Sequence, residues 1–127
     1  MCLAVKSRRL ELRSMGASVL VALLAGERAR AARILDCEIP ADLPLQDMPL
    51  AMRFDQLRRD PSVQPWLLRA MVDWSLGTMV GYIGFHSPPH PESLETSVPD
   101  VVELGYTVHA PFRRQGYATE AVLALMH

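Results

Sequence analysis

Two stretches of alternating residues separated by a short turn constrain the fold of this chain most strongly. Trp66–Trp74 and Thr78–Phe85 are rich in apolar and aromatic residues, and Ser75–Gly77 lies between them. A period of two sends successive side chains to opposite faces of a sheet, and a short glycine-containing connection is typical of a hairpin. The segment therefore predicts an antiparallel pair of strands. Gly81 and Gly84 within the second strand indicate a bulge or close packing.

Three helices are expected before this hairpin. Apolar residues cluster in Ala17–Leu24, and they recur at helical spacing in Glu27–Leu35. A third helix is expected to begin near Asp47 and to end at Asp60, because the proline that follows disfavours helical angles there. The larger side chains expected in the core include Leu50, Phe54 and Leu57 of the third helix and Trp66 and Trp74 of the hairpin.

One strand precedes these helices, and one strand and one helix follow the hairpin. Leu10–Arg13 alternates apolar and charged residues, which is typical of a half-buried strand. Val101–His109 shows the same alternation. Tyr117–Met126 predicts a helix that continues to the end of the chain. Together these elements predict one α+β domain over residues 1–127.

The composition is that of a globular domain without a nucleic-acid or membrane partner. Half of the 127 residues are hydrophobic, 21% are charged, and the formal net charge is −1. A chain with so little net charge has no basic field to attract nucleic acid or an anionic membrane. Two cysteines are too few for a disulfide framework. His86 and His90 have a spacing seen in metal sites, but no third ligand accompanies them, and no metal is expected.

The N-terminal segment imitates the order of an export signal. The basic pair Arg8–Arg9 is followed by the apolar run Ala17–Ala25 and by Ala29-Arg30-Ala31. Against export, Glu11 precedes the apolar run, and the run is too short to cross a bilayer. A strand followed by a buried helix explains the same pattern, so a cytoplasmic location is expected.

The segment that indicates a chemistry runs from the last strand into the last helix. Gly116 lies where that helix begins, after Arg113 and Arg114, and the small residue Ala118 follows. The first N–H groups of a helix lack intrahelical partners and carry partial positive charge, so a phosphate or pyrophosphate can bind there. No G-x-G-x-x-G motif follows an early strand, and no G-x-x-x-x-G-K-[ST] motif occurs. An ordinary strand–turn–helix corner remains the alternative.

The pattern Arg113-x-x-Gly116-x-Ala118 resembles the coenzyme A signature of the GNAT superfamily of N-acetyltransferases. The resemblance extends to residues 103–108 and 119–121 on either side, and to Arg9–Arg13 and Gly81–Phe85 earlier in the chain. These segments are similar to the ribosomal-protein-acetyltransferase-like branch. The resemblance implies an α/β/α fold with a mixed, mostly antiparallel sheet flanked by helices.

The resemblance also implies that the chain binds acetyl-CoA and transfers the acetyl group to a primary amine of a small molecule or peptide. The backbone around Val108 is implied to hold the pantetheine arm and to polarise the thioester carbonyl, and the amides around Gly116 are implied to hold the pyrophosphate. Glu103 is the implied general base, with a solvated strand residue as the alternative, and His109 is a weaker candidate. The residues implied to bind acetyl-CoA are Tyr106, Thr107, Val108, Arg113, Arg114, Gln115, Gly116, Tyr117, Ala118 and Thr119.

Relative to other GNAT proteins, the sequence ends before the C-terminal strands of the fold. Their absence is expected to leave Val101–His109 at a sheet edge, which favours aggregation or pairing with another chain and leaves a homodimer open. We expect this chain on its own to be a poor catalyst. A catalytically inactive acyl-CoA-binding or interaction module of degenerate GNAT fold is the alternative function.

Overall fold

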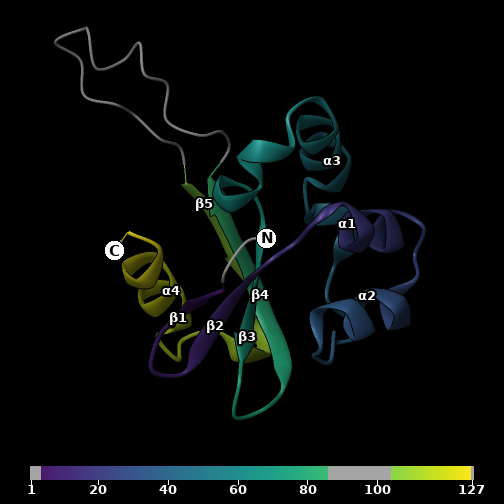
Figure 1. The fold of residues 1–127 in the computed structure, drawn as a ribbon. Helices are drawn as coiled ribbons and strands as arrows, with labels where there is room; N and C mark the ends of the chain where they lie inside the picture. Colours follow the sequence, from purple (N-terminus) through teal and green to yellow (C-terminus); the bar gives the residue numbers. More distant parts are fainter. Residues whose placement is uncertain (1–3, 86–103, 127) are drawn as a thin grey trace, which may run out of the picture.

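The computed structural model describes residues 4–85 and 104–126, which form an antiparallel sheet with helices on both faces (Figure 1). Its strands lie in chain order, and each pairs antiparallel with the next. An isolated parallel bridge joins Glu38 and Thr78. The strands are β1 (Val5–Lys6), β2 (Leu10–Ser14), β3 (Arg69–Asp73), β4 (Thr78–Phe85) and β5 (Leu104–Val108).

Helices cover both faces of the sheet, three on one face and one on the other (Figure 1). The predicted α/β/α arrangement is thereby confirmed. No helix within the described ranges is long and apolar enough to cross a membrane. The helices are α1 (Ala17–Leu24), α2 (Arg28–Leu35) and α3 (Leu50–Arg59) on one face and α4 (Tyr117–Leu125) on the other.

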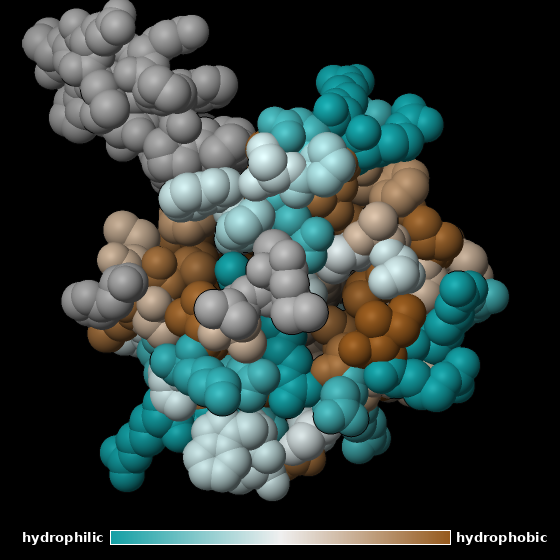
Figure 2. Space-filling model, viewed as in Figure 1, coloured by the Kyte–Doolittle hydropathy of each residue, from teal (hydrophilic) through white to brown (hydrophobic). Residues whose placement is uncertain are grey.

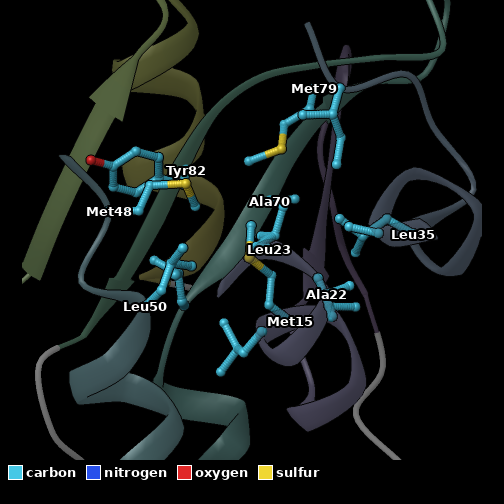
Figure 3. Close-up of a cluster of buried hydrophobic side chains, with 14 of the residues drawn as sticks. Met15, Ala22, Leu23, Leu35, Met48, Leu50, Ala70, Met79 and Tyr82 are labelled. Carbon is cyan, nitrogen blue, oxygen red and sulfur yellow. The ribbon is translucent and has the colours of Figure 1, made fainter. Parts of the chain in front are cut away.

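Each face of the sheet has its own hydrophobic core. Figure 3 shows Leu23 of α1, Leu50 of α3 and Tyr82 of β4 within the larger cluster. On the other face, Tyr117 and Ala121 of α4 pack with apolar residues of β2, β3 and β4. Fully burying a large apolar side chain contributes about 1.5–3 kcal/mol, so each cluster holds its helices firmly to the sheet. Both α4 and α1 also expose apolar side chains, among them Leu123 on α4 and Val21 and Leu24 on α1, and Figure 2 shows brown areas on both sides of the molecule.

The strand predicted over Trp66–Trp74 is shorter in the structure, and its two tryptophans lie outside the core. β3 begins at Arg69 because Pro61–Trp66 forms a short 3₁₀ helix. Trp66 and Trp74 are 39% and 59% exposed, so their predicted place in the core is wrong. All residues of β3 are buried. Helices cover both faces of this central strand, and alternation therefore does not separate buried from exposed side chains there.

The buried stripe of α3 differs from the prediction at one position. Leu50 and Leu57 are buried as expected, but Phe54 is only half-buried, and Arg53 is buried beside them. Arg53 donates a hydrogen bond to Gln56 and lines a cavity next to β5. A long aliphatic stem allows an arginine to pack in this way while its charged end stays among polar groups.

Two glycines allow other backbone segments to approach β4 closely. A Cβ atom on Gly81 would lie under 3.0 Å from the Thr107 carbonyl oxygen, and one on Gly84 would lie 2.5 Å from the Leu67 carbonyl oxygen. The register between β3 and β4 also shifts next to the pair formed by Met71 and Gly81. The bulge and close packing that the sequence indicates are therefore both present.

Replacing Gly81 by alanine is expected to weaken the pairing of β4 with β5, because the added methyl group overlaps backbone that cannot rotate away. Urea denaturation should show a loss of about 1–3 kcal/mol in the free energy of unfolding. Gly16→Ala is the control, since its Cβ meets only the flexible amide end of Gln64 at 3.2 Å. An equal loss in both variants would contradict the close approach at Gly81.

Candidate functional site

β5 carries two residues whose backbone groups face away from the rest of the sheet. His109, just after the strand, donates its N–H to Val80 O at 2.7 Å. Alternate residues of an antiparallel ladder direct their N–H and C=O groups toward the partner strand, so Thr107 also faces β4. Tyr106 and Val108 therefore direct theirs to the opposite side. No other strand within residues 4–85 and 104–126 pairs with that side.

Arg113 folds back from the following turn to this outward side of β5. Its Nε donates a hydrogen bond to Val108 O at 2.8 Å, which agrees with the outward direction of the Val108 carbonyl. The side chain thereby fixes the turn against the strand that precedes it. Of the two outward groups of Val108, the C=O is engaged by Arg113, and the N–H is the donor that a ligand can use.

The turn between β5 and α4 leaves the start of the helix accessible. Arg114 and Gly116 have left-handed backbone angles, with φ of 64° and 80°, and Gly116 is the N-cap of α4. The first intrahelical hydrogen bond runs from Glu120 N to Gly116 O at 3.0 Å, so the N–H groups of residues 117–119 precede it. Together with the helix dipole these groups form a positively polarised surface suited to an anion.

The outward side of β5 and the start of α4 line the same cavity, which has a volume of about 450 Å³. Of the residues that the sequence predicts to bind acetyl-CoA, all but Gln115 line it, and Gln115 is exposed in the same turn. Glu103, the predicted base, lies outside the described residues. The cavity is lined by Tyr106, Thr107, Val108, Phe112, Arg113, Arg114, Gly116, Tyr117, Ala118 and Thr119.

A buried hydrogen bond fixes the first residue of α4 to the sheet. Tyr117 Oη donates to Asp73 Oδ2, at the end of β3, at 2.5 Å. Burial and this hydrogen bond raise the pKa of Tyr117 to about 12. Burial alone would raise the pKa of Asp73, but the hydrogen bonds from Tyr117 and Ser75 outweigh it and hold that pKa below its usual range. The pair is thus a neutral phenol bound to a carboxylate at neutral pH.

A second polar contact joins the first turn of α4 to the segment before β2. Glu120 accepts hydrogen bonds from Arg9 Nε at 2.7 Å, from Arg9 N at 2.8 Å and from Ser7 Oγ at 2.5 Å. The Arg9 guanidinium also lies over the Tyr117 ring, 4.4 Å from its centroid. The sequence analysis missed these contacts, because Ser7 and Arg9 are more than a hundred residues away from Glu120 and share no local pattern with it.

Two further cavities border β5 on the face of the sheet that α3 covers, opposite to the face that α4 covers. Their volumes are about 210 Å³ and 350 Å³, and Arg53 lines the smaller one. Thr107 borders both of them and the cavity at α4, so the three spaces meet at this residue. In the larger one, His109 is buried, and its Nε2 lies 3.0 Å from Asp42 Oδ1. This contact holds the pKa of Asp42 below its usual range.

Comparison with known proteins shows which family contains this chain. The sequence matches the family model of the acetyltransferase (GNAT) domain over residues 9–127. The chain belongs to the GNAT acetyltransferase family. The match begins at Arg9, directly before β2, and the GNAT domain thus includes the whole of the β5–α4 segment that lines the cavity.

Two solved structures resemble the GNAT domain in fold. One is described as a GNAT-family acetyltransferase from Bordetella pertussis, with 19% identity and a TM-score of 0.54 over 97% of this chain and 68% of that chain. The other is described as a ribosomal-protein-serine acetyltransferase from Vibrio cholerae, with 18% identity and a TM-score of 0.55 over 99% of this chain and 67% of that chain. Comparison with curated protein sequences finds no match.

Tyr117→Phe is expected to lower the free energy of unfolding by about 1–3 kcal/mol at neutral pH, because a buried carboxylate oxygen of Asp73 loses its donor. Urea denaturation measures the loss. Tyr106→Phe is the matched control. It removes the same hydroxyl group from β5, where the side chain is 52% exposed, and should leave the free energy of unfolding nearly unchanged.

The difference between wild type and Tyr117→Phe should shrink as the pH falls. The pKa of Asp73 is lower in the folded than in the unfolded state, so its contribution is present above the unfolded pKa and is lost as the pH falls through the folded pKa. Without the phenol the folded pKa moves back toward its usual range. A difference that stays constant down to about pH 3, below the ordinary Asp pKa, would contradict this role of the ionised carboxylate.

Proposed function

We propose that this GNAT domain is an acetyl-CoA-dependent N-acetyltransferase that acetylates a primary amine of a small molecule or peptide. The observation that carries the proposal is the single cavity lined both by the outward side of β5 and by the start of α4. A strand edge suits an extended arm that carries amides, and a helix N-terminus suits phosphates. Acetyl-CoA joins these two chemical parts in one molecule.

The residues at the cavity fit the two parts of acetyl-CoA in order along the chain. Tyr106 and Val108 offer outward backbone groups to the pantetheine arm, and the N–H of Val108 is the donor for the thioester carbonyl oxygen. The amides of residues 114–119 receive the pyrophosphate, with Arg113 and Arg114 adding positive charge. Gly116 provides the left-handed turn that brings these amides to the cavity.

The proposed reaction is direct attack of a neutral amine on the thioester carbonyl carbon. A C–N bond forms, the C–S bond breaks, and the coenzyme A thiolate leaves and takes up a proton. The amine must lose a proton, and Glu103 is the proposed base that accepts it. Thr107, which borders the cavities on both faces of β5, marks the place where the acceptor meets the thioester.

Isothermal titration with acetyl-CoA tests the binding part of the proposal, with Gly116→Ala as the probe variant. An alanine at φ near 80° costs about 1–2 kcal/mol, and relief of that strain moves the amides of the turn. We expect the affinity for acetyl-CoA to fall about tenfold, which corresponds to about 1.4 kcal/mol.

Gly26→Ala is the matched control for the turn. Gly26 has a similar φ of 75°, lies between α1 and α2, and has no atom within 4 Å of an added Cβ. Both variants should lose similar stability in thermal unfolding, but only Gly116→Ala should lose affinity. Wild-type protein that neither binds acetyl-CoA nor protects the amides of residues 114–119 from hydrogen exchange would overturn the proposal.

Glu103→Gln separates acetyl transfer from binding. The variant should keep its affinity for acetyl-CoA and lose about 10²–10⁴-fold in turnover, as expected for removal of a general base. Turnover is measured as thiol release with a panel of amine acceptors, and the exposed Glu27→Gln serves as the control. Unchanged turnover would exclude Glu103 as the general base.

A further inference from the structure

Arg9 lies at the edge of the proposed phosphate site although it comes from the opposite end of the sequence. Its Nη2 atom lies 3.4 Å from the position that a Cβ on Gly116 would occupy. The guanidinium is stacked over the Tyr117 ring at 4.4 Å from the centroid. Glu120 accepts from its Nε, which leaves the N–H donors of both Nη groups outside this ion pair. A cationic fork is thereby held beside the first amides of α4.

The negative charge of Glu120 would repel a phosphate at the start of α4 unless a cation offsets it. Its carboxylate lies in the first turn of α4, where its charge opposes that of a phosphate at the helix N-terminus. Burial raises the pKa of Glu120, but the hydrogen bonds from Ser7 and Arg9 outweigh burial and hold that pKa below its usual range. The carboxylate is therefore ionised at neutral pH. Arg9 is the cation that offsets it.

We propose that Arg9 is a phosphate-binding residue of this site, whose Nη groups contact the phosphates of acetyl-CoA while its Nε neutralises Glu120. The inference rests on the proposed function. Tyr117 beneath the guanidinium and Glu120 beside it hold the side chain in place before the ligand arrives, which lowers the entropy lost on binding. A lysine cannot replace it, because one ammonium group lacks the planar fork that serves two partners at once.

Isothermal titration of the whole chain with two ligands tests the proposal. Acetyl-CoA carries the phosphates, and S-acetylpantetheine has the same thioester arm without them. Arg9→Met should weaken acetyl-CoA binding by about 10–100-fold and leave S-acetylpantetheine binding unchanged. Arg8→Met is the control, because it removes the same charge from an exposed neighbour. Arg9→Lys should also lose affinity for acetyl-CoA but not for S-acetylpantetheine. It replaces Arg9→Met as the test variant if circular dichroism shows that Arg9→Met does not fold.

Glu120→Gln separates phosphate binding from a purely structural role of the ion pair. Glutamine can still accept from Arg9 Nε through its one carbonyl oxygen but carries no charge that repels a phosphate, so the ratio of the acetyl-CoA affinity to the S-acetylpantetheine affinity should stay the same or rise. Equal weakening of both ligands in Arg9→Met would overturn the proposal and leave Arg9 a structural residue. Wild-type affinity in Arg9→Met would overturn it too, with the proposed function intact. Failure of the wild type to bind acetyl-CoA would instead refute the proposed function.

Discussion

The buried hydrogen bond between Tyr117 and Asp73 fixes where α4 begins, and the candidate site depends on that position. The phenol joins the first residue of the helix to the end of β3, in the middle of the sheet. Glu120, one turn further along, is held by Arg9 and Ser7 on the neighbouring segment. With these contacts in place, the amides at the start of α4 face the cavity beside β5. Without them, the apolar contacts of α4 alone would set its position.

The proposed function places one substrate on each side of β5. Its outward side and the start of α4 form the cavity proposed for acetyl-CoA. Its α3 side borders two more cavities, and Thr107 contacts all three spaces. Reacting atoms must come within about 3–3.5 Å of each other, so in this proposal the donor and the acceptor meet at the outward edge of β5 and not across its backbone.

Local patterns predicted most of the elements and the motif of the site. The ranges of α1 and β4 agree with the structure, and α4 ends at Leu125, one residue before the predicted end. These segments have a clear period or a glycine at a boundary. The two tryptophans were misplaced because alternation does not reveal where a strand begins and ends: Trp66 belongs to the 3₁₀ helix before β3, and Trp74 follows the last residue of β3.

The sequence could not reveal the contacts that position the site. Arg9 and Glu120 are separated by 111 residues, and Tyr117 and Asp73 by 44, so only the folded sheet brings them together. Sequence patterns report on the neighbours of a residue along one helix or strand. The network at α4 depends instead on side chains from three different segments. Within its own segment, each of these side chains looks like an ordinary surface residue.

The hydrogen bond from Arg113 to Val108 limits which partners can pair with the outward edge of β5. A regular strand that extended the sheet would need both the N–H and the C=O of Val108, and the guanidinium already occupies the carbonyl. A ligand that needs only one donor meets no such conflict. The Arg113 side chain therefore disfavours regular strand pairing at this position of the β5 edge, while the Val108 N–H still points outward.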